Sequence, residues 1–322
     1  MPTFCRHGRL EANCPICSKN ERAAPVARTG GRRPADAAKS PARRRSATRA
    51  GDLHVRRMAR AQDDGYDSWA APGLRATVEA QRLADEIAFS AARLADLESD
   101  PPGLYGEAAA AGGEEGLWLA FLIAYLSPVE GAAPFAGIET ARTAWSTGEL
   151  PDLEGVPLGP RSGHDAARGL ATLTAYRTRA ARAGSQAAAL AAGEASLNPQ
   201  RRFERAFERL SLPGLRRAPR YEFLVVAGRL GLLDVVPSSL LLGADPIDPT
   251  VVAAKRILGI GDAINLQRRA SELASEAGVP TAALDLAFLS WARPEEDRIT
   301  AGSSAEADQG ARGRVASVLG IA

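Results

Sequence analysis

The chain has 322 residues, of which 45% are hydrophobic and 24% charged, so it is long enough to bury a substantial core. Its longest apolar run, residues 117–126, is about half the ~20 residues of a membrane-spanning helix, and no hydrophobic stretch follows Met1, which argues against membrane and secreted proteins. All three cysteines lie within the first 17 residues. A disulfide framework for the rest of the chain is therefore excluded, and we expect a cytoplasmic protein, with association with the nucleoid left open.

The net charge of +2 hides an uneven distribution of charge along the chain. Residues 1–62 carry 15 Lys and Arg against 4 Asp and Glu, whereas residues 63–322 carry 25 against 34. Together with the composition, this asymmetry predicts four segments. They are a metal-binding segment at 1–20, a disordered Arg-rich linker at 21–75, a helical domain at 76–295 and a partly ordered tail at 296–322.

The first segment contains four potential ligands of one metal ion. Cys5, His7, Cys14 and Cys17 have the spacing Cys-x-His-x6-Cys-x2-Cys, and three thiolates with one imidazole complete a tetrahedral zinc site. Four ligands leave no open position for catalysis, so we expect structural zinc. The alternative is a redox Cys-x-x-Cys, but such a motif follows a strand and opens a helix, and no strand is predicted here.

The linker that follows is rich in arginine and poor in large apolar residues, so it cannot bury enough surface to offset its chain entropy. One interpretation is sequence-independent contact with nucleic acid phosphates. The other is a solvated leader from a high-arginine proteome. This feature alone favours neither.

From residue 77 onward, apolar residues recur at helical spacing, and no run alternates with a period of two. Proline, glycine and Asp-Pro signals mark where several of the helices begin or end. The pattern predicts an all-α fold without internal repeats. The expected helices cover residues 78–97, 115–126, 134–145, 165–183, 199–210, 217–230, 248–258, 262–277 and 281–292.

The most specific motif in the helical domain is Leu-Gly-Ile-Gly-Asp, which predicts two helices joined by a tight turn. Gly259 and Gly261 allow a conformation barred to other residues and a close approach of ligand to backbone, and Asp262 begins the next helix. The free N–H groups of that helix favour a phosphate, with Lys255 and Arg256 beside it. A dinucleotide-binding loop is excluded because no third glycine, preceding strand or βαβ unit is present.

Asp285 lies 24 residues beyond Gly261, between apolar neighbours. If this carboxylate is buried alone, its pKa should be raised. The alternative is an exposed acid on one face of an amphipathic helix.

These motifs resemble the helix-hairpin-helix DNA glycosylase superfamily, and within it the bacterial third clade of the α-glutamyl/putrescinyl thymine pyrophosphorylase group. The resemblance covers most of residues 105–292 together with 5–17. The segments that carry it are the Cys/His cluster, Ala124 to Glu130, Gly159 to Arg161, Ala254 to Arg256, Gly259 to Asp262 and Leu284 to Leu286.

The resemblance implies a helix-hairpin-helix glycosylase-like fold that contacts the DNA backbone through the hairpin glycines and extrudes a base into a pocket. It implies that Asp285 stabilises positive charge on the sugar or activates a nucleophile. Glu130 and His164 are second candidates for the pocket, although a loop histidine that caps the next helix is the alternative for His164. The superfamily's bifunctional members carry a lysine where this chain has Ala263, which disfavours a Schiff-base lyase step.

The sequence therefore predicts an enzyme that acts on a modified thymine or other pyrimidine in DNA, in phage defence or DNA modification. The reaction is either cleavage of the glycosidic bond or displacement at a substituent of the base. The alternative is a non-catalytic DNA-binding or adaptor protein that uses the hairpin and the zinc segment. A third hypothesis makes the zinc segment and linker a module that docks onto another protein.

Overall fold

The computed structural model describes residues 61–191, 196–243 and 245–321. Every regular element within these residues is a helix, and no strand occurs among them. The first four α-helices are α1 (Thr77–Ser99), α2 (Leu104–Ala111), α3 (Gly113–Leu126) and α4 (Ala136–Ala141). The next four are α5 (Ala171–Ala183), α6 (Gln186–Ala191), α7 (Pro199–Arg209) and α8 (Arg217–Arg229). The last four are α9 (Pro249–Leu258), α10 (Ala263–Ala277), α11 (Ala283–Trp291) and α12 (Gln309–Leu319). Two 3-10 turns, at Ala166–Arg168 and Glu295–Asp297, complete the set.

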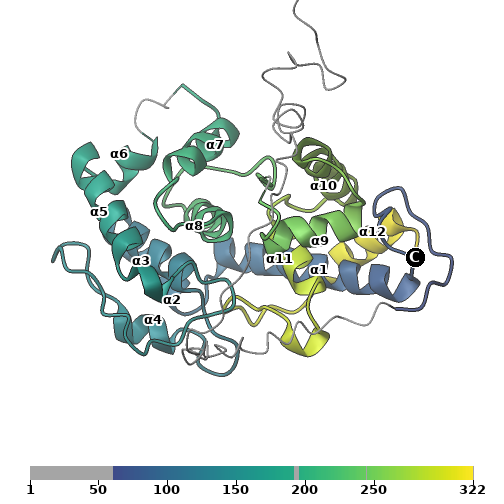
Figure 1. Ribbon diagram of the computed structural model, residues 1–322, viewed down its shortest axis with the longest axis horizontal. Coiled ribbons are helices and arrows are strands. Elements are labelled where there is room, and N and C mark those ends of the chain that lie inside the picture. Colours follow the sequence, from purple (N-terminus) through teal and green to yellow (C-terminus); the bar gives the residue numbers. More distant parts are fainter. Residues whose placement is uncertain (1–60, 192–195, 244, 322) are drawn as a thin grey trace, which may run out of the picture. The chain divides into compact units, whose positions relative to one another are not determined.

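Two helices with apolar residues on nearly every face form the centre of the core. In α3 most residues from Gly116 to Leu126 are buried, and α11 is buried along its whole length. Such helices need neighbours on all sides. Helices α2 and α8 pack on α3, while α1 and α9 pack on α11. Figure 1 shows α9, α10 and α12 gathered around α1 and α11.

The all-α prediction is confirmed, but several helix boundaries differ from the expected ones. The helix expected at 134–145 is limited to Ala136–Ala141, and the one expected at 165–183 divides into a 3-10 turn and α5. Gly169, with φ +52°, separates these two parts. Helices α2 and α6 are short and rich in alanine, so neither has the apolar stripe that would have predicted it.

Both flanks of the expected helical domain also contribute to the core. At the N-terminal side, Ala71 and Leu74 are buried although they precede the expected start at residue 76. At the C-terminal side, the expected tail contains α12, whose Val315 and Leu319 are fully buried against α1. The hydroxyl of Tyr66 donates to the Leu319 carbonyl at 2.6 Å and so joins the two flanks. The compact unit therefore extends beyond the apolar pattern at both ends.

None of the helices among the described residues is long and apolar enough to cross a membrane.

Candidate functional site

Asp285 lies in the first turn of α11 and is only 2% exposed. Its two carboxylate oxygens each accept from a different arginine. Nη2 of Arg217 is 2.7 Å from Oδ1, and Nη2 of Arg161 is 2.5 Å from Oδ2. The expected alternative, an exposed acid on an amphipathic helix, does not describe this residue. The carboxylate instead holds two guanidinium groups together in the interior.

The loop that carries Arg161 is fastened to the C-terminal end of α3. The N–H of Gly159 donates to the carbonyls of Leu126 and Ser127, and the N–H of Gly163 donates to the Tyr125 carbonyl at 2.8 Å. A Cβ on Gly159 would lie 2.0 Å from the Pro128 carbonyl oxygen. Only glycine permits this approach of two backbone segments, so Gly159 allows the loop to present Arg161 to the interior.

Asp285 belongs to a continuous chain of six buried charged side chains. In order of contact, this ion-pair chain consists of Arg93, Glu222, Arg161, Asp285, Arg217 and Asp248. Successive partners approach to between 2.5 and 3.2 Å, and every side chain is at most 10% exposed. Three positive and three negative formal charges cancel, which offsets part of the large desolvation cost of burying them.

Burial by itself raises the pKa of Asp285, but the charges of Arg217 and Arg161 outweigh it and hold the pKa below its ordinary value. The same balance applies to Glu222, where burial raises the pKa and Arg93 and Arg161 lower it further than burial raises it. The expectation of a raised pKa for an isolated carboxylate is thus wrong for Asp285, because this carboxylate is not isolated. Asp285 is ionised at neutral pH and has both oxygens occupied.

A pocket of about 250 Å³ adjoins this ion-pair chain. Its walls include Arg161, Arg216 and Arg217, together with the N-terminal end of α9 at Asp248 and the apolar side chain of Leu289 from α11. Asp285 is not among the lining residues; it lies behind the two arginines that it binds. We call this cavity the arginine pocket. Arg161 and Arg217 belong to its wall with side chains that are 3% and 7% exposed, Arg216 is exposed, and Asp245 and Asp248 are acidic residues of the same wall.

Polar groups at the arginine pocket retain unused hydrogen-bonding capacity. Nε of Arg161 and Oγ1 of Thr250 are buried and have no hydrogen-bond partner among the described residues. Arg216 is exposed and forms no ion pair with any described residue. Buried polar groups are normally satisfied, so the two unpaired atoms mark the wall of the arginine pocket as incompletely hydrogen-bonded.

His164 and Glu130, the other two catalytic candidates, are not lining residues of the arginine pocket. His164 lines a neighbouring hollow of about 510 Å³ that shares Ser162 and Arg216 with it, and Nδ1 of His164 is 3.3 Å from the Tyr125 hydroxyl. Glu130 is exposed, and its carboxylate accepts from the N–H and the hydroxyl of Thr300. The fold therefore brings His164 close to the arginine pocket and uses Glu130 to fix a loop.

The hairpin expected at residues 258–262 is present between α9 and α10. Gly259 has φ +84°, in the region that favours glycine, whereas a Cβ on Gly261 would make only an ordinary contact at 3.4 Å. Asp262 begins α10, and its Oδ1 accepts from the N–H of Asn265 at 2.8 Å. In the part of the chain that the structure describes, the N–H groups of Gly259, Ile260 and Gly261 donate to no acceptor. Ile260 in the middle of the turn is 95% exposed, whereas the nitrogen of Gly259 lies close to Gly73, where a Cβ would be 3.0 Å from it.

The two basic residues predicted beside the hairpin have different environments. Lys255 is exposed. Arg256 lies over the ring of Trp291, with its guanidinium carbon 4.9 Å from the ring centroid. Arg269, which sequence reasoning did not single out, donates to the carbonyl of Leu258 and so caps the end of α9. Only Lys255 of these three is a freely exposed cation.

Sequence reasoning missed most of the ion-pair chain. Arg93, Glu222 and Asp248 were not proposed as site residues, Arg161 was named only within the motif Gly159 to Arg161, and Arg217 only as the start of an expected helix. The available signal was a charged residue inside an apolar run, as for Glu222 in Tyr-Glu-Phe-Leu-Val-Val. A single charge of this kind has no identifiable partner until the fold is known.

The predicted zinc ligands Cys5, His7, Cys14 and Cys17 lie outside the described residues, as does the linker up to residue 60. Within the described ranges, no group of three or more His, Cys, Asp or Glu side chains is arranged to hold a metal ion.

The chain was compared with protein-family models, curated proteins and solved structures, and none of them matches it.

Proposed function

We propose that the protein binds DNA through the α9–α10 hairpin and processes a base that is extruded from the duplex into the arginine pocket. The observation that carries the proposal is that helix α9 bears the hairpin at its C-terminal end and the arginine pocket at its N-terminal end. The resemblance of the hairpin and Asp285 motifs to helix-hairpin-helix glycosylases supports it. We further propose that the helical unit has this glycosylase-like fold.

The hairpin supports the DNA-binding part of this proposal through its backbone. The N–H groups of Ile260 and Gly261, which have no acceptor among the described residues, can donate to phosphate oxygens, and the N-terminus of α10 adds a partial positive charge. Lys255 is the exposed cation beside them. Contacts of this kind fix position on the DNA without reading its sequence.

The hairpin and the arginine pocket are far enough apart for the hairpin to hold the DNA backbone while one nucleotide leaves the stack and enters the pocket. Helix α9 has 10 residues and is therefore about 15 Å long at 1.5 Å per residue. Phosphates of one strand are spaced at about 3.4 Å along the duplex axis, so the two sites are about four steps apart. An enzyme that acts on a base within a duplex has to extrude that base, because the reacting atoms are inaccessible in the stack.

Between the two reactions expected from sequence, the charges at the pocket favour displacement at a substituent of the base. Cleavage of a glycosidic bond develops positive charge on the sugar, which Arg216 and Arg293, the lining cations outside the ion-pair chain, would disfavour. Departure of an anionic group, such as pyrophosphate from an activated hydroxymethyl base, develops negative charge that they would stabilise. We therefore assign the contact with the leaving group to the exposed Arg216, and to Asp285 the role of holding Arg161 and Arg217 in place.

A general-base role for Asp285 has little support. A base has to be within hydrogen-bonding reach of the proton that it takes, and this carboxylate is 2% exposed with both oxygens bound by arginine. His164 is a better candidate to receive a proton from an attacking nucleophile, because it lines the hollow next to the arginine pocket.

The same occupied carboxylate is the observation that favours the second candidate, a non-catalytic DNA-binding protein. In that case the ion-pair chain serves only to join α1, α8, α9 and α11, and the pocket receives no base. The N-terminal Cys/His segment would bind structural zinc under either hypothesis.

The deciding experiment incubates the full-length protein with duplex DNA that contains a pyrophosphorylated hydroxymethyl pyrimidine, and identifies the released nucleosides by mass spectrometry. We expect the bond between the hydroxymethyl carbon and pyrophosphate to break and a bond to water or to an added amine to form in its place, with pyrophosphate released and the glycosidic bond intact. Ala292→Phe should block the pocket, and Ala292→Ser is the matched control that leaves it open. DNA binding without any change of the nucleosides, equal in both variants, would support the non-catalytic alternative.

A further inference from the structure

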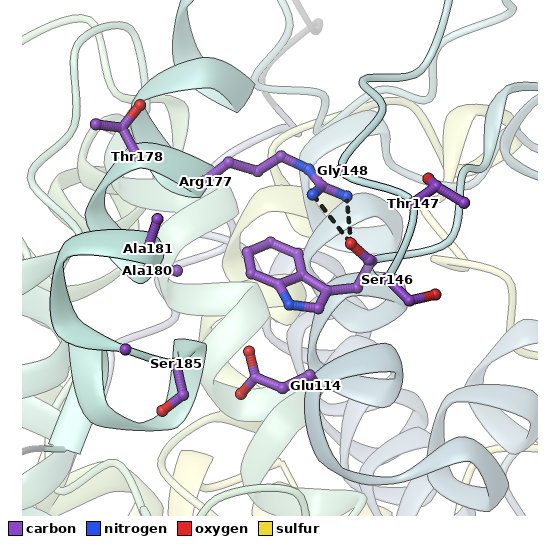
Figure 2. A pocket seen from close by; sticks show the side chains of 11 residues that line it. Glu114, Ser146, Thr147, Gly148, Arg177, Thr178, Ala180, Ala181 and Ser185 are labelled. Atoms are coloured by element: carbon purple, nitrogen blue, oxygen red, sulfur yellow. Dashed lines mark hydrogen bonds between the residues drawn. The ribbon is translucent and has the colours of Figure 1, made fainter.

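A second pocket, of about 510 Å³, lies between α5 and the loop at residues 145–148. Arg177 reaches from α5 to this loop, where its guanidinium donates to the carbonyl oxygen of Trp145 (Figure 2), with Nη1 at 3.1 Å. It also donates to the carbonyl oxygen of Ala144 at 3.1 Å. The guanidinium carbon lies 4.3 Å from the ring centroid of Trp145 and 4.7 Å from that of Trp118. The pocket therefore has a wall in which a planar cation is stacked on a partly exposed indole.

The cations of α5 lack acidic partners. The helix contains Arg177, Arg179 and Arg182 but no Asp or Glu, and none of the three forms an ion pair with a described residue. In α7, by contrast, Arg201 and Arg205 pair with glutamates of the same helix. Burial lowers the pKa of Arg177, and only the charge of nearby Glu115 opposes this effect. Residues 63–322 as a whole carry an excess of acidic side chains, 34 against 25 basic ones. Helix α5 is an exception, because its positive charges have no acidic partners among the described residues.

The two glutamates close to the pocket are already engaged by backbone donors. Glu114 accepts from the N–H of Gln186 at 2.9 Å and so caps the start of α6. Glu115 accepts from the N–H groups of Trp145 and Ser146, which hold the pKa of Glu115 below its ordinary value against the opposing effect of burial. Glu114 lines the pocket and Glu115 does not, so the wall includes one carboxylate, which the start of α6 engages, beside the guanidinium of Arg177. With Arg182 exposed on the same helix as Arg177, the charges around the pocket suit a ligand that combines an aromatic ring with negative charge.

The remaining walls fit such a ligand. Ala180, Ala181 and Gly184 are small and let a planar ring approach, while the hydroxyl groups of Ser146 and Ser185 can bond to its polar edge. Figure 2 shows Ala181 and Ser185 on the α5 side, across from the loop of Ser146 and Thr147. The volume lies within the ~300–1,000 Å³ that ligand pockets commonly have.

We propose that this pocket binds an unpaired nucleotide of a DNA strand. The base stacks on the indole of Trp145, and the flanking phosphates lie along Arg177 and the exposed Arg182 of α5. Aromatic stacking together with a basic track is how proteins hold single strands without reading their sequence. The site is separate from the hairpin and from the arginine pocket, and it contributes a grip on a single strand whether or not the proposed base chemistry occurs.

The test uses the full-length chain and an oligothymidylate of about eight nucleotides, within the ~4–16 nucleotides typical of such sites. Ala181 is exposed on the rim of the pocket, so Ala181→Glu places a carboxylate there and Ala181→Gln is a neutral control of the same size. We expect Ala181→Glu to weaken binding at least about fivefold at low salt, and Ala181→Gln to bind as the unchanged chain does.

Trp145 provides the second readout. Trp145→Phe keeps a ring and should retain binding, whereas Trp145→Ala should weaken it at least about fivefold, since stacking of a base is worth ~1–3 kcal/mol. Binding of the oligonucleotide should quench tryptophan fluorescence in the unchanged chain and less in Trp145→Phe. Equal affinity of Ala181→Glu, Ala181→Gln and the unchanged chain for the oligonucleotide would overturn the proposal.

A variant of the hairpin, Gly261→Glu, distinguishes this proposal from the proposed function. It should weaken duplex binding but leave the quenching of tryptophan fluorescence by the oligonucleotide intact.

Discussion

Asp285 and Arg217 form a buried ion pair in which Oδ1 and Nη2 are 2.7 Å apart, although 68 residues separate them in the sequence. Arg217 also reaches Asp248 through Nε at 2.6 Å, and Asp285 also holds Arg161. Asp285 and Arg217 are thus each compensated by two oppositely charged neighbours. This arrangement, rather than any single residue, determines what the arginine pocket presents to a ligand.

Removing the charge of Asp285 should destabilise the protein strongly. Asp285→Asn keeps the shape of the side chain but leaves Arg161 and Arg217 without their shared counter-charge. Loss of one partner of a buried pair costs about 3–5 kcal/mol, so we expect a reduction of that size in the free energy of unfolding measured with urea. Asp297→Asn, at an exposed site close in sequence, should change it by less than about 0.5 kcal/mol. Equal midpoints for Asp285→Asn and the unchanged chain would mean that the ion-pair chain contributes nothing to stability.

The ion-pair chain should also make stability depend on pH in the acid range. Asp285 and Glu222 have pKa values below their ordinary values in the folded state, so the unfolded chain binds protons first as pH falls. Their stabilising contribution is fully present above the unfolded-state pKa of about 4 and is lost as pH falls through the lower folded-state values. Urea unfolding between pH 7 and pH 2.5 should show this loss, and Asp285→Asn should flatten the curve below pH 4. A stability that rises on acidification through this range would contradict the assignment.

The two glycines of the hairpin should respond differently to substitution. Gly259→Ala places a side chain at φ +84°, where a non-glycine residue costs about 1–2 kcal/mol, so unfolding should occur at lower urea concentration. Gly261→Ala should change stability by less than about 0.5 kcal/mol, because its added methyl group meets only an ordinary contact. If the turn lies against a DNA phosphate, Gly261→Ala should nevertheless weaken duplex binding. Unchanged affinity for a duplex would argue against contact at Gly261.

Substitutions at Lys255 and Arg256 should distinguish a residue that contacts DNA phosphate from one that stabilises the fold by packing. Lys255→Gln should lower affinity for any duplex and reduce the slope of log affinity against log salt by about 1, as for loss of one phosphate contact. Arg256→Gln removes the cation stacked on Trp291, so we expect its main effect on thermal stability. Titrations of both variants at several salt concentrations, together with their melting temperatures, check this. The reverse pattern would assign the phosphate contact to Arg256.

The zinc expected at the N-terminus is tested by metal analysis of the purified full-length chain. One zinc per chain should be found, and Cys14→Ser or Cys17→Ser should lower it because each removes one of four ligands. Retention of stoichiometric zinc in both variants would rule out this ligand set.

The sequence by itself determined the features that depend on neighbouring residues. Asp248-Pro249 begins α9, Gly259 supplies the positive φ of the turn, and Asp262 caps α10, because caps and turns are formed within a few residues. The all-α class follows from apolar spacing in the same local way.

Only the tertiary structure decided what Asp285 does. Its neighbours in sequence are apolar and left open either a carboxylate buried alone, with a raised pKa, or an exposed acid on an amphipathic helix, yet Arg161 and Arg217 reach it from a loop 124 residues away and a helix 68 residues away. The sign of a buried charge's pKa shift depends on which charges lie within a few ångströms, and this is set by how α3, α8 and α11 pack. Local pattern identifies an acid between apolar neighbours, whereas its burial, its ionisation and its partners are properties of the folded core.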